Sequence, residues 1–305
     1  MVRAIDLFAG FGGTSLGAHM AGVSVVWAAN HCPVAVRVHE ANHPNAEHVC
    51  QDLRQADWGN LPTYDLLLAS PACQGHSTAS QPRRRGFHDA MRATAWAVID
   101  CAEVTSPRAI AVENVLEFAR WQLYPLWLEA LRKLGYRTTE HRLSATSHGV
   151  PQKRERLFIT AVRRRKPPVT AIAGNTVLEP AIGPLLDDSA PGWKPWRSMS
   201  SGVQERIRRG QSRCGRRFLT QHVTGHSGVP LHEPIRTITT KDHWGLVDGD
   251  MYRSLTVREY ARAMGFPDSY AWPDDIGRTR AIQGLGNAVP PPMARDVVAA
   301  LAEAA

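Results

Sequence analysis

The chain has 305 residues, 43% of them hydrophobic, and a formal net charge of +8 at pH 7. This length and ordinary apolar fraction exclude global disorder and allow one large or two modest domains. No apolar run approaches the roughly twenty residues that span a bilayer. The positive charge therefore predicts an anionic partner other than a membrane, with nucleic acid as the first candidate.

The five cysteines show no CxxC spacing, and no secretory leader precedes them. We therefore expect neither a disulfide framework nor a zinc site, but a reduced protein of the cytoplasm. Scattered histidines such as His31, His76 and His148 lack ligand spacing, so no metal is predicted.

The first 165 residues alternate strand and helix signals. Strands are predicted over residues 2–8, 24–28, 65–69, 108–112, 136–143 and 157–162, and helices over 15–21, 34–41, 91–104 and 123–134. Such alternation predicts an α/β fold with a doubly wound, mostly parallel sheet. Ligand sites in this architecture lie at the carboxyl ends of the strands.

The first predicted strand runs into a glycine-rich turn at Gly10, Gly12 and Gly13. Glycines let the backbone approach a ligand closely, and the helix that follows offers free amide donors. The turn suits a nucleoside-type cofactor. A dinucleotide oxidoreductase is the obvious rival, but the spacing is not G-x-G-x-x-G, which disfavours it.

A cysteine follows the third predicted strand. Pro71 blocks strand pairing and is expected to leave Cys73 on an exposed turn, where a nearby helix start would lower the pKa of its thiol. We therefore interpret Cys73 as a nucleophile rather than as a small buried hydrophobe. Glu113 comes at the end of another predicted strand, so we expect the two side chains to share one pocket.

Regular patterns are lost beyond residue 165. Pro, Gly, Ser and Arg dominate up to about residue 217, with a short strand candidate at 237–240, which indicates a separate irregular recognition lobe. Arginine-rich runs at 153–166 and 206–217 favour a phosphate-binding surface over a merely solvated face. Thr256 and Glu259 then have the spacing of a capping box, Gly265 is expected to end that helix, and a last helix is predicted over 293–302.

Six motifs, in this order, resemble those of the DNA cytosine-5 methyltransferase family: residues 6–13 (DLFAGFGG), 70–75 (SPACQG), 113–115 (ENV), 152–158 (QKRERLF), 255–259 (LTVRE) and 286–290 (GNAVP). The resemblance covers nearly the whole chain. It implies a catalytic domain of the S-adenosylmethionine-dependent methyltransferase type over residues 1–165, a target-recognition domain over 166–254 and a return segment over 255–305. It also implies transfer of a methyl group from S-adenosylmethionine to carbon 5 of a flipped-out cytosine in double-stranded DNA, through a covalent Cys73 adduct.

The resemblance implies three groups of site residues. Cys73 would be the nucleophile, Glu113 would hold the target ring, Arg156 would reach its carbonyl oxygen, and Arg154 would support Arg156. The cofactor would be bordered by Phe8, Gly10, Phe11, Gly12, Gly13, Asn30, His31, Asp52, Asn287 and Ala288. Candidate DNA contacts are Gln74, Ser77, Arg216, Arg217, Thr239, Thr240 and Lys241.

Three alternatives stay open. His31 stands where the family usually has an acidic residue, which weakens the expected ribose contacts and admits a modified donor with an extra carboxylate. The basic lobe also permits structured RNA as substrate. A non-catalytic DNA-binding module is the third, although the complete motif set speaks against it. We expect a monomer that acts in the bacterial nucleoid or in a phage-infected cell, with a cognate restriction endonuclease as candidate partner.

Overall fold

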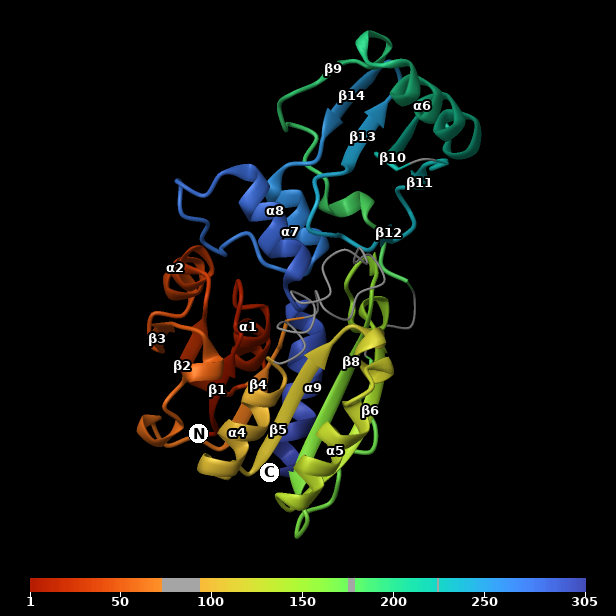
Figure 1. Cartoon of the computed structure of the whole chain (residues 1–305). Helices are drawn as coiled ribbons and strands as arrows, with labels where there is room; N and C mark the ends of the chain where they lie inside the picture. Colours follow the sequence, from red (N-terminus) through yellow and green to blue (C-terminus); the bar gives the residue numbers. More distant parts are fainter. Residues whose placement is uncertain (73–93, 175–178, 224) are drawn as a thin grey trace.

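Figure 1 shows the computed structural model of the chain, which describes residues 1–72, 94–174, 179–223 and 225–305. A seven-stranded sheet has the order β3-β2-β1-β4-β5-β8-β6. Its strands are β1 (Arg3–Leu7), β2 (Ser24–Asn30), β3 (Glu47–Cys50), β4 (Leu66–Ala69), β5 (Ala109–Asn114), β6 (Tyr136–Ser144) and β8 (Glu155–Arg163). Strands β1 to β5 pair in parallel, and β8 runs antiparallel to β5 and β6. The predicted α/β fold with a mostly parallel sheet is confirmed.

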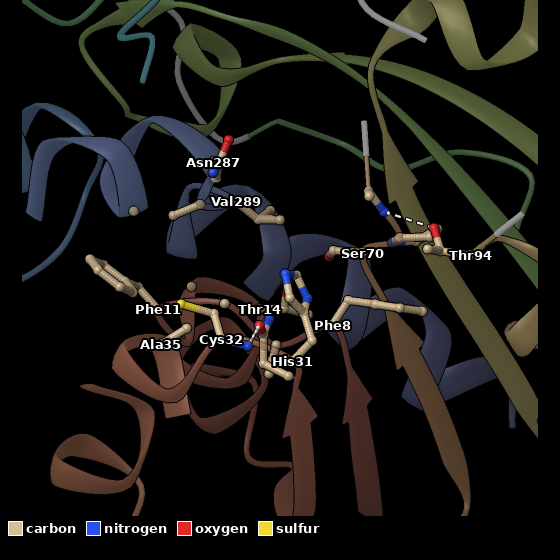
Figure 2. Close-up of a pocket in the computed structure, with 18 of the residues that line it drawn as sticks. Phe8, Phe11, Thr14, His31, Cys32, Ala35, Ser70, Thr94, Asn287 and Val289 are labelled. Atoms are coloured by element: carbon tan, nitrogen blue, oxygen red, sulfur yellow. Dashed lines mark hydrogen bonds between the residues drawn. The ribbon is translucent and has the colours of Figure 1, made fainter. Parts of the chain in front are cut away.

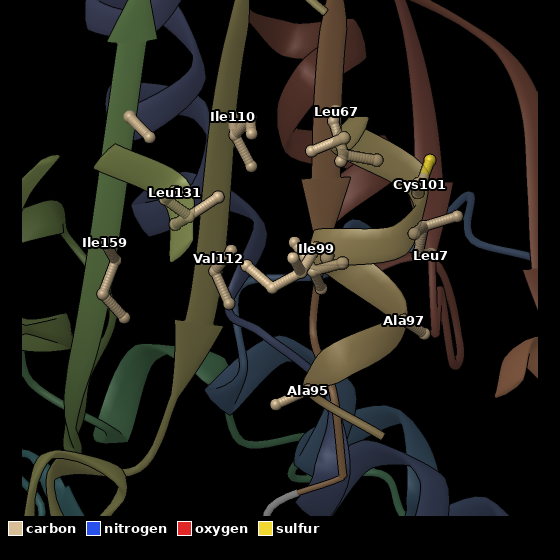
Figure 3. Close-up of a cluster of buried hydrophobic side chains, with 14 of the residues drawn as sticks. Leu7, Leu67, Ala95, Ala97, Ile99, Cys101, Ile110, Val112, Leu131 and Ile159 are labelled. Carbon is tan, nitrogen blue, oxygen red and sulfur yellow. The ribbon is translucent and has the colours of Figure 1, made fainter. Parts of the chain in front are cut away.

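Helices cover both faces of this sheet because side chains alternate along its central strands. On one face, residues such as Leu7, Leu67 and Val112 form a core with α4 (Trp96–Thr105) and α5 (Tyr124–Lys133), as Figure 3 shows. On the other face, Ala4 and Leu68 belong to a core that includes residues of α1 (Gly13–Met20) and α9 (Pro291–Ala304). The C-terminal helix thus packs on a sheet built from residues 3–163.

A second, five-stranded sheet forms what we call the lobe, residues 194–254. Its strand order is β11-β10-β13-β14-β9, with β9 (Lys194–Pro195), β10 (Arg217–Gln221), β11 (Val229–Pro230), β13 (Trp244–Asp248) and β14 (Met251–Ser254). Helix α6 (Ser201–Cys214) packs on it, where Ile207 joins Phe218 and Val247 in a small core.

Two expectations for this region were wrong. The prediction of a stretch without clear helices missed α6. Its packed face consists of only Val203, Ile207, Gly210 and Cys214 within an arginine-rich sequence, so the helical pattern is weak. The predicted strand at 237–240 is irregular. The pairing strand comes just before it, as β12 (Ile235–Arg236), which pairs in parallel with β7 (Gln152–Lys153).

Two helices lie between the lobe and the large sheet (Figure 1): α7 (Val257–Ala263) and α8 (Arg278–Asn287). The predicted capping box of α7 is confirmed, because Glu259 N donates to Thr256 Oγ1 at 3.1 Å and Thr256 N donates to a Glu259 carboxylate oxygen at 2.7 Å. Helix α8 has no counterpart in the sequence prediction. Ile282 of α8 and Leu246 of the lobe share one core, which joins the two parts.

The remaining elements complete the described chain. They are helix α2 (Pro33–Asn42) and the 3₁₀ turns η1 (Leu53–Gln55), η2 (Trp58–Asn60), η5 (Leu116–Arg120), η6 (Ala145–His148), η7 (Gly183–Leu185) and η8 (Trp196–Ser198). Within these ranges, no helix has both the length and the apolar character needed to cross a bilayer.

Candidate active site

A cavity of about 730 Å³ opens at the carboxyl ends of the central strands, with α8 on its far side. Figure 2 shows Asn287 facing His31 and Cys32 across it. Nine of the ten residues expected around a cofactor line this cavity: Phe8, Gly10, Phe11, Gly13, Asn30, His31, Asp52, Asn287 and Ala288. Glu113 and Arg156 line it as well.

The glycines in the turn after β1 have two functions: one faces the cavity, and the others allow close packing within the protein. Gly10 has φ +55°, and a Cβ there would find only Phe8 O within 4 Å, so its bare peptide faces the open cavity. Gly12 is the expected cofactor residue that does not line the cavity. A Cβ on Gly12 would lie 2.5 Å from the Tyr270 hydroxyl, and one on Gly13 would lie 2.0 Å from Val289 O. Gly12 and Gly13 therefore let the start of α1 pack against the C-terminal segment.

Two polar groups hold the other side of the cavity in shape. Asn30 Oδ1 accepts a hydrogen bond from Cys32 N at 2.9 Å, which fixes the turn that carries His31. Asp52 accepts hydrogen bonds from Arg54, chiefly from its side chain, which lower the pKa of Asp52 to about 2. Asp52 is therefore ionised at neutral pH and offers acceptor oxygens at the cavity edge. Bare peptide at Gly10, an ionised acceptor and apolar side chains fit a nucleoside-type cofactor.

Glu113 and Arg156 form an ion pair at the cavity wall. Arg156 Nε lies 3.0 Å from Glu113 Oε1, and each side chain is almost buried. The two strands that carry them, β5 and β8, are antiparallel neighbours, with Glu113 opposite Phe158. Burial raises the pKa of Glu113, and the charges of Arg156 and Arg154 offset this only in part. The pair is thus a carboxyl group that holds its proton more firmly than usual, beside a fixed positive charge.

Arg154, expected among the catalytic groups, is not a cavity-lining residue. Its guanidinium is 1% exposed and donates to three carbonyl oxygens: Ile238 O at 3.0 Å, and Gly286 O and Ala288 O at 2.9 Å. It therefore acts on the cavity by holding the segment on either side of Asn287, which corrects the prediction that it supports Arg156 directly.

Cys73, Gln74 and Ser77 lie outside the described residues, so their predicted roles stay predictions. The segment before them is described. Residues 70–72 line the cavity, and Figure 2 shows the hydrogen bond from Ala72 N to Thr94 Oγ1 at 3.2 Å.

The candidate DNA contacts of the lobe lie in two places. Arg216 and Arg217 sit at the end of β10 farthest from α7, where Arg216 pairs with Asp248 and Arg217 pairs with Asp188. Their charges are thus partly neutralised, away from the cavity. Thr239, Thr240 and Lys241 are exposed. A Cβ on Gly286 would lie 2.3 Å from Thr239 O, so this segment runs directly beside the end of α8.

Sequence reasoning missed the contribution of α8. Arg280 and Gln283 line the cavity, and the motif at 286–290 gave no signal for them, because the helix before that motif was not predicted. Among the described residues, no group of three or more His, Cys, Asp or Glu side chains could hold a metal ion.

The chain matches the family model "C-5 cytosine-specific DNA methylase" over residues 2–182 and 190–303. It is 27% identical to the type II methyltransferase M.NlaX of Neisseria lactamica, over 97% of this chain and 95% of that protein. It is 29% identical to the type II methyltransferase M.DsaV of Dactylococcopsis salina, over 97% and 84%.

Solved structures share its fold. The S. pombe Dnmt2 methyltransferase matches with a TM-score of 0.74 and 19% identity, over 99% of this chain and 98% of that one. The Entamoeba histolytica methyltransferase EhMeth matches with a TM-score of 0.70 and 18% identity, over 99% and 98%. With a family match across nearly all of the chain, the protein belongs to the C-5 cytosine-specific DNA methylase family and is a DNA cytosine-5 methyltransferase that takes its methyl group from S-adenosylmethionine.

Proposed function

We propose that Cys73 attacks carbon 6 of a cytosine swung out of duplex DNA, while Glu113 binds ring nitrogen 3 and Arg156 binds the carbonyl oxygen of the same ring. One observation carries this proposal. A buried carboxyl group and a guanidinium, 3.0 Å apart, stand at the wall of a cavity that residues 70–72 also line, and the chain continues from there into Cys73.

The reaction needs a covalent step because carbon 5 of cytosine is too weak a nucleophile to accept a methyl group unaided. Addition of the Cys73 thiolate forms a bond between sulfur and carbon 6. The electron pair of the 5,6 double bond then moves to carbon 5, and nitrogen 3 receives a proton. Once carbon 5 carries the methyl group, a base removes the carbon 5 proton, and the electron pair left behind forms the 5,6 double bond again as the thiolate leaves. Nitrogen 3 then returns its proton to Glu113.

Glu113 suits the proton transfer to nitrogen 3. Burial raises its pKa, so its carboxyl group favours the protonated form and can give its proton to the ring. Arg156 acts in the opposite direction on this pKa and stabilises the carboxylate that remains. Both groups are fixed before reaction, so little reorganisation is needed when charge develops on the ring.

S-adenosylmethionine supplies the methyl group as an electrophilic sulfonium substituent. We infer that the bare peptide at Gly10 lies against it, that Asp52 accepts from its adenine, and that Asn287 closes over its methionine end. His31 takes the position near the ribose. Since an imidazole offers fewer acceptors than a carboxylate, the mass of the modified nucleoside decides between the ordinary donor and one with an extra carboxylate.

The lobe would bind the DNA around the flipped base. Flipping costs a few kcal/mol, which phosphate contacts and pocket hydrogen bonds offset. We propose residues 166–254 as the target-recognition domain between the two parts of a catalytic domain, 1–165 and 255–305. Within it, exposed Thr239, Thr240 and Lys241 lie nearer the cavity than Arg216 and Arg217 and are the better candidates for base contacts.

The assembly proposal is the simplest one. We propose that the protein acts as a monomer. The relatives named above are type II methyltransferases, which supports a cognate restriction endonuclease as genetic partner.

Replacement of Cys73 by Ser tests the nucleophile. Base-resolution sequencing of DNA from an expressing host first identifies the modified site. A duplex with 5-fluorocytosine at that site should trap the wild-type enzyme covalently, because fluorine cannot leave as the carbon 5 proton does, whereas Cys73→Ser should form no adduct. Turnover of Cys73→Ser on ordinary DNA should fall at least a thousandfold.

Exposed Cys50 provides the matched control, since it lies outside the cavity lining. Cys50→Ser should trap and methylate like the wild type. An adduct with Cys73→Ser, or methylation of transfer RNA instead of DNA in a parallel assay, would refute the proposal.

A further inference from the structure

The Pro71–Ala72 peptide group is held at both of its polar ends. Asn114 Nδ2 donates to Pro71 O at 3.1 Å, and Ala72 N donates to Thr94 Oγ1 at 3.2 Å. One residue earlier, Ser70 N donates to Leu7 O at 3.0 Å. Since a peptide group is planar, fixing both its C=O and its N–H sets its orientation.

The two side chains that hold this peptide are themselves fixed. Asn114 ends β5, is 1% exposed, and its Oδ1 accepts from Val115 N at 2.9 Å. Thr94 is 7% exposed, and its carbonyl oxygen accepts from Ala97 N at 3.2 Å in the turn before α4. Both anchors therefore belong to rigid parts of the catalytic domain.

The Thr94 side of this arrangement continues into the core. The carbonyl oxygen of Ala95 accepts a hydrogen bond from the indole Nε1 of Trp127 at 2.9 Å, and Trp127 is fully buried in α5. A displacement of Thr94 would therefore disturb the packing between α4 and α5. These contacts fix the Thr94 hydroxyl in the position where it accepts the hydrogen bond from Ala72 N.

Ala72 is the residue directly before Cys73, and both Ala72 and Thr94 line the cavity. We propose that Thr94 is a positioning residue for the reaction: together with the Asn114 amide, its hydroxyl fixes the Pro71–Ala72 peptide and so the direction in which the chain continues to Cys73. The proposal rests on the proposed role of Cys73. Small errors in the placement of a reacting group are costly, up to about a hundredfold in rate for a shift near 1 Å.

Thr94→Val removes the hydroxyl with almost no change in shape, and Thr94→Ser keeps it. The measurement is the single-turnover rate of adduct formation with the 5-fluorocytosine duplex, alongside dissociation constants for DNA and S-adenosylhomocysteine. We expect Thr94→Val to form the adduct about ten to a hundred times more slowly, with both dissociation constants within about twofold of wild type. Thr94→Ser should recover the rate to within about threefold. If the hydroxyl of Thr94 only stabilised the fold, its loss would weaken ligand binding together with the rate of adduct formation.

Thr105 is a matched control at the other end of α4, where its hydroxyl donates to Cys101 O. Thr105→Val should react at the wild-type rate. If Thr94→Val does not fold, Thr94→Ala makes the same comparison with Thr94→Ser without a second methyl group.

Several results would overturn the inference. A wild-type rate in the hydroxyl-free Thr94 variant overturns it, and so does a Thr94→Ser variant as slow as Thr94→Val. A wild-type enzyme that forms no adduct, or an adduct formed by Cys73→Ser, instead refutes the proposed function and the inference with it. The two failures are therefore distinguishable.

Discussion

At the scale of single residues, the site depends on a buried carboxyl group, Glu113, whose pKa is raised although an arginine lies beside it. Burial raises the pKa of Glu113, whereas the ion pair with Arg156 lowers it, and burial is the larger effect. A group with a raised pKa stays protonated to higher pH and loses its proton, and with it its function as an acid, as the pH rises through that pKa. A plot of reaction rate against pH should therefore fall on its alkaline side, and the position of this alkaline limb is set by the pKa of Glu113.

Glu113→Gln tests this role. An amide can donate a hydrogen bond to nitrogen 3 but cannot give up a proton, so we expect the single-turnover methylation rate to fall by about a hundredfold or more. DNA affinity should change little, and the alkaline limb should disappear. Glu117→Gln, at a position in η5 outside the cavity lining, is the control and should keep the wild-type pH profile. Retention of the alkaline limb in Glu113→Gln would assign it to another group.

At the scale of secondary-structure elements, Arg154 joins three segments. Its guanidinium links the break between β7 and β8 to the residue before Thr239 and to the chain on both sides of Asn287. A charged donor with three carbonyl partners in a buried place contributes far more than a surface arginine, because its loss leaves those oxygens without donors.

We expect Arg154→Met to lower the free energy of unfolding by about 3 kcal/mol or more. Since the lost bonds flank Asn287, affinity for the cofactor should also fall by about tenfold or more. Urea unfolding and calorimetric titration with S-adenosylmethionine measure the two effects. Lys153→Met, at the exposed neighbouring position, should change both only slightly. If Arg154→Met binds the cofactor normally, the link does not shape the cavity.

Elements were predictable where apolar periodicity was strong. The central strands and α5 follow simple patterns, and the capping box of α7 could be recognised from Thr256 and Glu259 alone. The edge strand β3 and helices α6 and α8 were harder to recognise. No residue of β3 is buried. The packed faces of α6 and α8 are built largely from small residues such as Gly210 and Ala281, set among charged and polar residues.

The candidate site followed a similar rule. Residues within the motifs, such as Glu113 and Asn287, follow from the order of motifs along the chain. Arg280 and Gln283 do not, since they reach the cavity only because α8 crosses above it. Arg154 was expected beside Arg156, two residues further along the chain. It lies in the break between β7 and β8, outside both strands, so strand alternation does not place the two side chains on one face. Its side chain is directed to the carbonyl groups behind the site.

At the scale of the whole molecule, burial keeps many histidines neutral. The pKa is lowered, with burial as the first cause, for His39, His43, His48, His141, His222 and His226. Both the lobe and the sheet that carries the cavity contain such groups. An unfolded histidine has a pKa near 6.5, so below that pH the unfolded chain binds more protons than the folded chain. Stability should therefore fall as the pH drops from about 6.5 towards 4.

Buried Asp6 opposes this trend. It accepts a hydrogen bond from Ser15 Oγ at 2.7 Å, its other oxygen has no hydrogen-bond partner within the described ranges, and burial raises its pKa to about 7. The stability that Asp6 contributes is thus full below its unfolded pKa near 4 and is lost as the pH rises through 7. The histidines outnumber the buried carboxyl groups with a raised pKa, so acid should still destabilise the wild type.

Asp6→Asn separates the two effects, because it removes the carboxyl titration and leaves the histidines in place. The unfolding free energy of the variant minus that of the wild type should be about 2 to 3 kcal/mol larger at pH 8 than at pH 5. Its acid limb should also be steeper than that of the wild type. Urea unfolding at several pH values measures both, and Asp57→Asn, at an exposed position, should show no such difference. No difference between pH 8 and pH 5 would instead mean that Asp6 is already ionised in the folded protein at pH 5, held by the hydrogen-bonded row of Ser15, His39 and His48 behind it.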